Sequence, residues 1–464
     1  MKKIILRLLL TVIVIGLLLG IRYAWVSFPI ISGFDAKEMC SCVFVSERDQ
    51  KGIDTSEFTD FPLSLARNEV NFQDSSVTST IWGMAKKKAI YRRGIGCTLI
   101  NGISENELRK QSFPVPAAPL QGNDTIPWPY GDKIANTISS NIDTIKLAAA
   151  VDKAFTEPHP GKKQRTRSVV VVYNGQLVAE KYATGFNKDT RMYGWSMAKS
   201  VTGALIGTLV LQGKLHIAGP APVIEWNDPK DPRHAISIKN LLQQESGLDF
   251  LEDYSKASDV TNMLYKEGDM AAFTAGHSLA QSPGSLFNYS SGNSNILSRI
   301  IRQTVGEKDY AAYPATALFY KIGMYHTLFE PDASGTYVGS SYINATARDY
   351  ARFGLLYYND GVSQGERILP EGWVKETVTA AAENKLKSYG YQFWLNGLNK
   401  NDPSQKAFPG VPADMFYCDG YAGQAIYVIP SKKLVIVRLG LTLDRSFDEV
   451  AFLKSILESV DRKL

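Results

Sequence analysis

The clearest hydrophobic pattern lies at the N-terminus. Leu8–Ile21 is apolar apart from Thr11, Gly16 and Gly20, and Arg22 follows it directly. Three basic residues precede the run: Lys2, Lys3 and Arg7. Fourteen residues suit the core of a signal peptide, whereas the eighteen counted from Ile4 suffice for a tilted membrane anchor. We therefore expect residues 1–33 to be a signal peptide or an uncleaved N-terminal anchor.

The basic flank of this segment also predicts its orientation. Positive charge before an apolar segment stays on the cytoplasmic side. We expect an exported protein, periplasmic or extracytoplasmic, held at the inner membrane if the segment is not cleaved.

The next part of the chain shows shorter patterns. Residues 34–110 contain β-like runs at 41–46, 77–82 and 88–91, which predict a small N-terminal β-rich lobe. Residues 111–140 then form a stiff connector, because five prolines fall within them: Pro114, Pro116, Pro119, Pro127 and Pro129.

The main domain, residues 141–464, begins with a predicted helix over 141–155. A hairpin follows over 167–183, with Asn174-Gly175 as its turn, and further strands are predicted at 389–395, 424–429 and 433–439. A final helix is expected over 446–460. We predict an α+β fold: a five-stranded antiparallel sheet from both ends of the domain, flanked by helices, with an all-helical insertion between. A doubly wound α/β hydrolase would instead alternate strands and helices.

Ser196 and Lys199 are the strongest candidates for chemistry. The residues that follow, Val201–Leu211, are apolar almost all round, which predicts a central, buried helix. Residues three apart share a helix face, so the Ser196 hydroxyl and the Lys199 amine come within reach of each other. A serine is a weak nucleophile until a base takes its proton, and burial of a lysine favours the neutral amine that can do so.

The composition argues against several classes of function. The chain is 44% hydrophobic and 21% charged, with a net charge of +5, as in globular proteins. The basic clusters at 86–88 and 162–167 lack interleaved aromatic residues, so we expect no nucleic-acid binding. Five scattered histidines and no paired C-x-x-C predict no metal site.

The four cysteines all follow the export segment, so disulfides are permitted. We prefer a bridge between Cys42 and Cys97, with buried free thiols as an equally weighted alternative. Cys40 and Cys418 are left unassigned.

Two further stretches carry polar or glycine-rich patterns. Tyr289, Ser290 and Ser291 lie in a loop before a helix that begins near Asn293, where a capping turn with a packed tyrosine is the simpler interpretation. Gly420–Gln424 leads into the strand at 425–429. Glycines at a strand edge let a substrate lie against exposed N–H groups, although a simple turn is the alternative.

In this order the three stretches resemble the motifs of the serine β-lactamase/transpeptidase superfamily, also called penicillin-binding-protein-like. Ser196 and Lys199 match S-x-x-K, Tyr289 and Ser291 match Y-x-N or Y-x-S, and residues 421–423 stand at K-T-G without its cation. The chain is most similar to the class C β-lactamase-related branch, with family VIII esterases and 6-aminohexanoate-dimer hydrolases. The resemblance covers 141–464 and has supporting stretches at 238–248, 346–356 and 365–373.

This resemblance implies a mechanism. Ser196 would attack a carbonyl and form an acyl-enzyme, with Lys199 and Tyr289 sharing the role of base. The N–H groups of Ser196 and Gln424 would hold the oxyanion. The substrate would lie against four residues: Ser291, Tyr421, Ala422 and Gly423.

The missing cation in the third motif indicates a neutral ester or amide, from a small molecule or short peptide, in preference to a penicillin. No cofactor is implied. The oligomeric state is left open.

Three alternatives remain beside this interpretation. Residues 194–198 nearly fit a G-x-S-x-G nucleophile elbow, but the last glycine is absent and no apolar strand precedes Ser196. A membrane-tethered, non-catalytic sensor or binding module could keep the pocket and lose turnover. A metalloenzyme is least favoured, because no H-E-x-x-H spacing occurs.

Overall fold

The computed structural model describes residues 2–119, 124–159, 161–444 and 446–460. It divides into two compact units. Unit 1 comprises Met1–Gln111, Leu251–Asp269 and Asp332–Ser334, and unit 2 comprises Ser112–Phe250, Met270–Pro331 and Gly335–Leu464. Unit 1 is thus completed by two segments that the sequence analysis had placed in the main domain.

Unit 1 combines one long helix with a small sheet. Helix α1 runs over Lys2–Phe44, and the four strands form an antiparallel sheet in the order β1-β2-β3-β4. The strands are β1 Ala66–Asn71, β2 Ser76–Ile81, β3 Met84–Arg92 and β4 Gly96–Leu99. The short helices are α2 Gln50–Asp54, α3 Glu105–Lys110 and α7 Asp259–Lys266. The strand predicted over 41–46 is wrong, because α1 continues through most of it.

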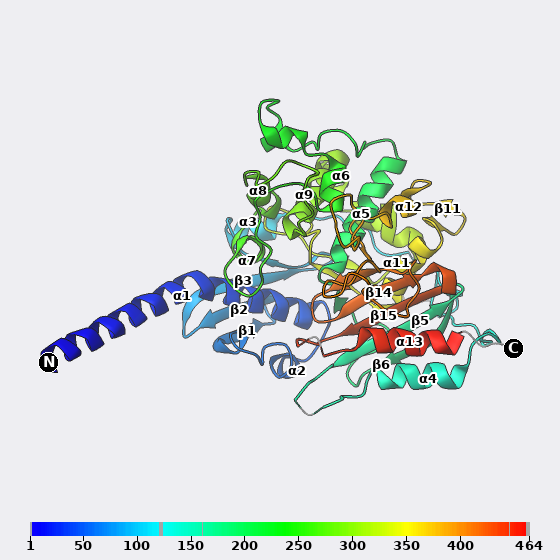
Figure 1. Ribbon diagram of the computed structural model, residues 1–464, viewed down its shortest axis with the longest axis horizontal. Coiled ribbons are helices and arrows are strands. Elements are labelled where there is room, and N and C mark those ends of the chain that lie inside the picture. The colour runs from blue at the N-terminus through cyan, green and yellow to red at the C-terminus, as the bar shows by residue number, and fades with distance from the viewer. Residues whose placement is uncertain (1, 120–123, 160, 445, 461–464) are drawn as a thin grey trace. The chain divides into compact units, whose positions relative to one another are not determined.

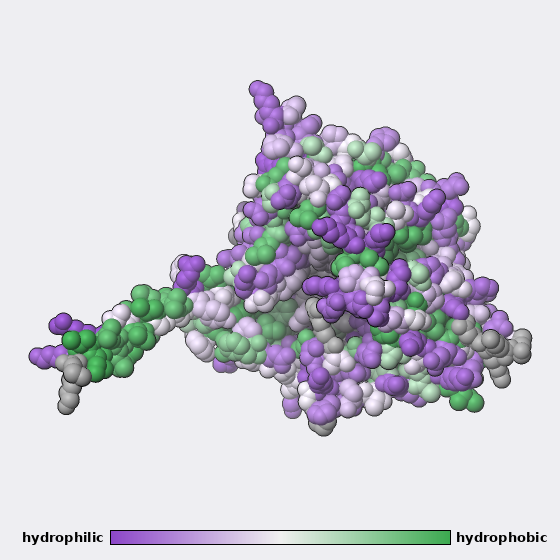
Figure 2. Space-filling view, viewed as in Figure 1, coloured by the Kyte–Doolittle hydropathy of each residue, from purple (hydrophilic) through white to green (hydrophobic). Residues whose placement is uncertain are grey.

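The two halves of α1 meet different surroundings. The half before Tyr23 is apolar, exposed and long enough to cross a membrane (Figures 1 and 2). The half after Ser27 is built into unit 1, where Ala36, Met39 and Cys40 are fully buried. Gly33 is required at one contact, because a Cβ there would lie 2.9 Å from the carbonyl oxygen of Tyr265 in α7.

The structure joins Cys97 to Cys40, so the predicted bridge between Cys42 and Cys97 is wrong. Residues two apart on a helix point about 200° away from each other, so only one of Cys40 and Cys42 can face β4. Cys42 is buried elsewhere, where its sulfur accepts a hydrogen bond from Arg48 at 3.6 Å. Cys418 is also buried, and burial raises the pKa of its thiol to about 12.

Unit 2 is built on a six-stranded antiparallel sheet in the order β12-β13-β14-β15-β5-β6. The strands are β5 Thr166–Tyr173, β6 Gln176–Tyr182, β12 Trp394–Leu395, β13 Phe416–Gly420, β14 Gln424–Ile429 and β15 Leu434–Gly440. The predicted hairpin and the two last strands are confirmed. The strand predicted over 389–395 is reduced to β12, and β13 was not predicted.

Alternate residues of the sheet face two different cores. Val169 and Val171 of β5 pack with α4 (Thr144–Lys153) and α13 (Glu449–Val460), which lie together on one face (Figure 1). Val170 and Val172 face the other core, which contains α5 Met197–Leu211, α9 Ser291–Val305 and α11 Ala347–Tyr358. Period-two alternation of this kind is what a sheet covered on both faces requires.

The insertion between β6 and β12 is mainly helical, but it is not all helical. Its remaining helices are α6 Ile238–Gln243, α8 Met270–Ala275, α10 Glu307–Tyr310 and α12 Trp373–Thr377. It also contains short strands, namely β7 Met192–Tyr193, β8 Leu328–Phe329, β9 Ile343–Ala345, β10 Val362–Ser363 and β11 Glu366–Arg367. The first three form a small antiparallel sheet that leads directly into α5.

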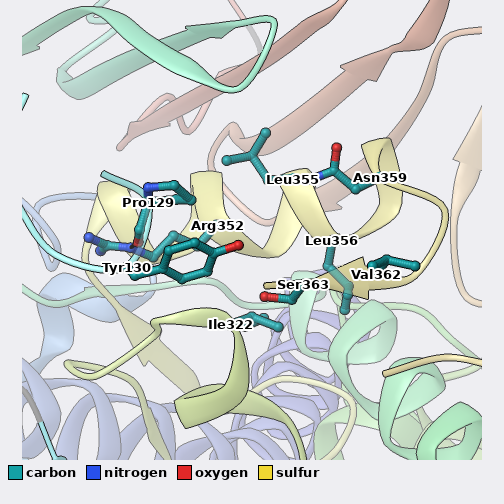
Figure 3. A pocket seen from close by; sticks show the side chains of 9 residues that line it. All are labelled: Pro129, Tyr130, Ile322, Arg352, Leu355, Leu356, Asn359, Val362 and Ser363. Carbon is teal, nitrogen blue, oxygen red and sulfur yellow. Dashed lines mark hydrogen bonds between the residues drawn. The ribbon is translucent and has the colours of Figure 1, made fainter. Parts of the chain in front are cut away.

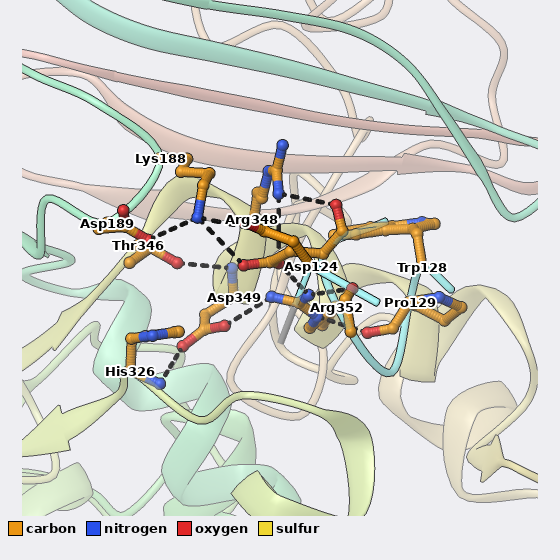
Figure 4. Close-up of polar contacts among 12 residues, drawn as sticks. Asp124, Trp128, Pro129, Lys188, Asp189, His326, Thr346, Arg348, Asp349 and Arg352 are labelled. Atoms are coloured by element: carbon orange, nitrogen blue, oxygen red, sulfur yellow. Dashed lines mark hydrogen bonds and ion pairs between the residues drawn. The ribbon is translucent and has the colours of Figure 1, made fainter. Parts of the chain in front are cut away.

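A cluster of ion pairs holds the end of the proline-rich connector against α11 (Figure 4). The carboxylate of Asp132 lies 2.8 Å from Arg352, 3.2 Å from Arg348 and 3.6 Å from Lys188. Burial raises the pKa of Asp132, but the hydrogen bond from Arg352 and these cationic charges lower it overall. Arg352 also donates to the carbonyl of Pro129. The connector is therefore a fixed part of unit 2.

Candidate active site

Ser196 is presented by a tight passage from β7 into α5. Gly194 must be glycine, because a Cβ there would lie 2.5 Å from the Tyr350 hydroxyl. Trp195 has φ +48°, a left-handed conformation that a bulky residue rarely adopts. Such strain persists where the surrounding structure enforces it, often at functional sites. Ser196 is the N-cap of α5 and is partly exposed.

The predicted central helix is confirmed. Thirteen of the fifteen residues of α5 are buried. Gly207 is needed where the helix passes Trp373, since a Cβ would lie 2.9 Å from its ring. Lys199, in the first turn, is only 1% exposed. The ammonium of a lysine is costly to bury without hydrogen-bond partners.

Lys199 has those partners. Its Nζ lies 3.0 Å from each of three oxygens: Ser196 Oγ, Ser291 Oγ and the carbonyl of Ser340. The Lys199 amine thus contacts both Ser196 and Ser291, and Ser291 belongs to the second predicted stretch. The carbonyl of Ser340 was not predicted, because it comes from a loop that carries no motif.

Tyr289 also lies close to this amine. Its ring centre is 4.9 Å from Lys199 Nζ, and the ring stacks on Trp394 at 5.3 Å. The ring of Tyr389 meets it edge-on at 5.7 Å. The structure thus brings together the hydroxyl of Ser196, the amine of Lys199 and the ring of Tyr289.

The loop that carries Tyr289 is fixed by a buried glutamine. The carbonyl of Gln244 accepts the N–H of Asn288 at 2.8 Å, and its side-chain oxygen accepts the N–H of Ser290 at 3.1 Å. The same oxygen accepts the Asn293 amide at 2.8 Å. The sequence analysis missed Gln244, although it lies in the supporting stretch 238–248.

The third stretch, residues 420–424, forms the turn between β13 and β14. Gly420 packs against the carbonyl of Gly194, so the start of this turn lies beside the serine loop. Tyr421 is 49% exposed, and its ring lies 5.5 Å from that of Trp195.

Gln424 lies on the other arm of this turn, in β14, and its side chain is buried. Its amide donates to the carbonyls of Tyr421 and Gly440, at 2.9 and 2.7 Å. The contact with the serine loop is made at Gly420, which pairs with Gln424 across the turn. The assignment of the Gln424 N–H to the oxyanion hole stays a prediction. Ala422 is buried and Gly423 is half-buried. The ring of Trp195 contacts Tyr193 and Tyr421, and neither Ala422 nor Gly423 takes part in these contacts.

Arg438, in β15, holds the turn 420–424 through a hydrogen bond to its backbone. It is buried in β15 and donates to the carbonyl of Gly423 at 2.9 Å. It also donates to the carbonyl of Gln164 and the hydroxyl of Thr166, at 2.8 and 2.9 Å. Burial is the main cause that lowers its pKa, to about 10. The sequence analysis missed this residue because no pattern marks a lone arginine in an apolar strand.

A pocket elsewhere in unit 2 does not include the motif residues. This small pocket lies between the connector and α11 and is lined by Tyr130, Arg352 and Asn359, among others (Figure 3). Within the described residues, no group of three or more His, Cys, Asp or Glu side chains could hold a metal ion.

Comparison with known proteins decides the family. The beta-lactamase family matches residues 151–450. The chain belongs to the beta-lactamase family. It is a β-lactamase-related serine hydrolase, as the resemblance of its motifs implied.

Individual relatives agree with this assignment. The chain is 24% identical over 296 residues to 6-aminohexanoate-dimer hydrolase of Paenarthrobacter ureafaciens, covering 59% of this chain and 72% of that enzyme. The fold is similar to a family VIII carboxylesterase at a TM-score of 0.53 and 14% identity, covering 70% of this chain and 100% of the esterase. A penicillin-binding protein homologue from Caulobacter crescentus gives the same score and identity, with 70% and 98% covered.

Proposed function

We propose that this protein hydrolyses a neutral ester or amide through an acyl-enzyme on Ser196. One observation carries the proposal: the buried Lys199 amine lies 3.0 Å from Ser196 Oγ, with the Tyr289 ring 4.9 Å from the same nitrogen. A nucleophile within hydrogen-bond reach of a base is the arrangement that covalent catalysis needs.

The first step moves one proton and forms one bond. As Ser196 Oγ attacks the substrate carbonyl, its proton passes to the neutral amine of Lys199, assisted by the Tyr289 phenol. The attack requires Lys199 in its neutral form, with a lone pair free to accept the proton. The carbonyl of Ser340 and the hydroxyl of Ser291 keep the amine pointed at Oγ.

The carbonyl oxygen becomes an oxyanion in the tetrahedral intermediate. The N–H of Ser196 lies at the N-terminus of α5, where developing negative charge is stabilised. We assign the second donor to the N–H of Gln424, which pairs across the turn with Gly420, the residue that touches the serine loop. Collapse of the intermediate breaks the bond to the leaving alcohol or amine, which takes the proton. Water then releases the acyl group by the reverse sequence.

The side chains near the turn support a neutral substrate. Tyr421 and Trp195 are aromatic, and Lys or His is absent from residues 421–423, where a substrate carboxylate would be gripped. The Tyr289 ring, which lies 4.9 Å from the Lys199 amine, and the Trp394 ring stacked on it are aromatic as well. A small ester, amide or short peptide with uncharged groups beside its carbonyl fits this lining.

The test combines labelling with turnover. A fluorophosphonate should label wild type but not Ser196→Ala, and p-nitrophenyl acetate hydrolysis should disappear in the same variant. Lys199→Ala and Tyr289→Phe should each lower kcat by about 10² or more. Ser285→Ala is the matched control, because Ser285 is an exposed serine of the Tyr289 loop outside these contacts.

Full activity in Tyr289→Phe would remove Tyr289 from the mechanism. Labelling at Ser196 without turnover of any ester, amide or D-amino-acid peptide would favour the non-catalytic module. Rapid turnover of nitrocefin would contradict the preference for a neutral substrate.

We propose further that residues 2–22 anchor the protein in a membrane, with both units on the extracytoplasmic side. The exposed apolar half of α1 and the Cys40–Cys97 disulfide support this, since disulfides persist in oxidising compartments. The full chain should stay in the membrane fraction after alkaline carbonate extraction. Recovery in the soluble fraction would contradict an anchor.

A further inference from the structure

The turn between β2 and β3 presents two large apolar side chains to solvent. Trp82 is 71% exposed and Met84 is 51% exposed, with Gly83 between them. Ile81 pairs with Met84, so Trp82 and Gly83 form a two-residue hairpin turn, and both have positive φ, +51° and +76°.

This turn type normally carries asparagine, aspartate or glycine at its first position. A bulky residue with positive φ is a steric outlier. Trp82 therefore contributes nothing to the turn that a smaller residue would not do better. Its side chain is the feature that needs an explanation.

The turn lies next to α1 at the point where the helix leaves the sheet. The ring of Trp82 meets that of Phe28 edge-on at 5.4 Å. Ser32 Oγ donates to the carbonyl of Ala85 at 2.6 Å, which fixes β3 to the helix. Phe28 and Ile31 pack with Ile81, the last residue of β2.

The apolar length of α1 sets where this point falls. Ile4–Ile21 is eighteen residues, or about 27 Å of helix, close to the hydrocarbon thickness of a bilayer. Arg22 then marks the polar boundary. Tyr23 and Trp25 follow it, both exposed, as in the aromatic belts of membrane proteins. Phe28 is less than one further turn along.

We propose that Trp82 and Met84 insert into the headgroup region of the bilayer that holds α1, beside Tyr23 and Trp25. The exposed Lys86, four residues after Trp82, meets the lipid phosphates. The partner is thus a lipid surface, and the second contact fixes the tilt of α1 and the orientation of unit 1. This inference rests on the proposed anchor.

The opposite end of the same sheet supplies a control. Phe72, in the turn between β1 and β2, is 68% exposed and lies 5.7 Å from Phe44, the last residue of α1. Phe44 is sixteen residues beyond Phe28, or about 24 Å along the helix. An aromatic residue at position 72 should therefore stay in water.

Quenching by brominated lipids tests the proposal on the full chain in phosphatidylcholine vesicles with bromine near the headgroup end of the acyl chains. Two of the seven tryptophans lie in unit 1, Trp25 and Trp82. Trp82→Phe and Trp25→Phe should each lower the quenched emission by about half if the two share the interface. Phe72→Trp should add emission that the lipid does not quench.

The outcomes separate the two proposals. If only Trp25→Phe lowers the quenched emission, the anchor stands and the contact by the β2–β3 turn is wrong. If neither substitution lowers it, the anchor itself is wrong. Quenching of the tryptophan introduced at position 72 would show that the whole sheet, and not this turn, meets lipid, and would equally overturn the proposal.

Discussion

Two buried side chains hold the third stretch, residues 420–424, in its position near Ser196. Arg438 and Gln424 each hold one arm of the turn 420–424 through its carbonyls, at Gly423 and Tyr421. Neither side chain touches Ser196 in the contacts described above. Both are positioning residues, because a donor N–H stabilises an oxyanion only if it is held in place before the reaction.

Arg438→Met should therefore lower kcat by about tenfold or more with a smaller change in KM, since a small misplacement of a donor is costly. Steady-state ester hydrolysis measures both constants. Arg348→Met is the control, because Arg348 is equally buried but pairs with Glu180 and Asp132. It should lower stability and leave kcat unchanged. Equal kcat losses in the two variants would mean that Arg438 only supports the fold.

The buried Asp35 makes the stability of unit 1 depend on pH. It is fully buried, and burial raises its pKa well above the usual value. Asn68 donates to one oxygen at 3.3 Å, and the other has no partner among the described residues. A raised carboxyl pKa makes the folded state hold its proton longer than the unfolded state. Stability from this group is then full below the ordinary carboxyl pKa and is lost as pH rises through the folded value.

Asp35→Asn should consequently gain melting temperature relative to wild type as pH rises from 5 to 8, because the amide has no proton to lose. Thermal unfolding at several pH values measures the difference. A difference that is independent of pH would show that Asp35 does not titrate between the folded and unfolded states.

The sequence predicted part of the candidate site for a local reason. Ser196 and Lys199 are one helical turn apart, so their contact follows from helix geometry alone. Gln244 and the carbonyl of Ser340 reach the site only through tertiary contacts, and no spacing encodes them.

At the scale of elements, continuous apolar strands were predictable and irregular ones were not. The runs in β5, β14 and β15 are β-branched and buried on both faces, which is typical of central strands. The aromatic run at 389–395 instead bends at Gln392, which has φ +56° and donates to the carbonyls of Leu241 and Leu242. That contact, absent from the local pattern, overrides the strand propensity of its neighbours.

The second half of α1 was missed for a similar reason. Pro29 and Gly33 are unfavourable inside a helix, and the sequence analysis predicted a strand over 41–46 where α1 runs to Phe44. The helix continues because Ala36, Met39 and Cys40 repeat at helical spacing and are fully buried. Tertiary burial thus outweighs two unfavourable residues.

The Cys40–Cys97 disulfide links the second half of α1 to β4, and removing it measures how much this link stabilises the fold. Cys40 and Cys97 are 57 residues apart in the sequence. Closing a loop of this length lowers the entropy of the unfolded chain, which stabilises the folded state by about 4 kcal/mol. Cys40→Ser should lose a free energy of unfolding of that order in denaturant titrations under oxidising conditions. Cys42→Ser, two residues away, should lose much less. The reverse order of effects would support the Cys42–Cys97 pairing.

At the scale of the whole molecule, the exposed and buried halves of α1 predict two different truncations. Deleting residues 2–21 removes only exposed helix and leaves Ala24, Phe28 and Ile31 with unit 1. This variant should be soluble, resist proteolysis in unit 1 and keep wild-type kcat on a soluble ester. Deleting residues 2–33, as cleavage of a signal peptide would, takes away three buried hydrophobic residues, Phe28, Ile30 and Ile31.

The longer truncation should therefore open unit 1 to protease and expose the Cys40–Cys97 disulfide to mild reductant, because burying a Phe or Ile side chain stabilises a fold by about 1.5–3 kcal/mol each. Limited proteolysis and thiol labelling compare the two variants side by side. By the same argument the chain isolated from cells should retain its first 33 residues, which the mass of the intact protein reports. Equal protease resistance in both truncations would show that unit 1 does not depend on this part of α1, and cleavage near residue 33 would then be tolerated.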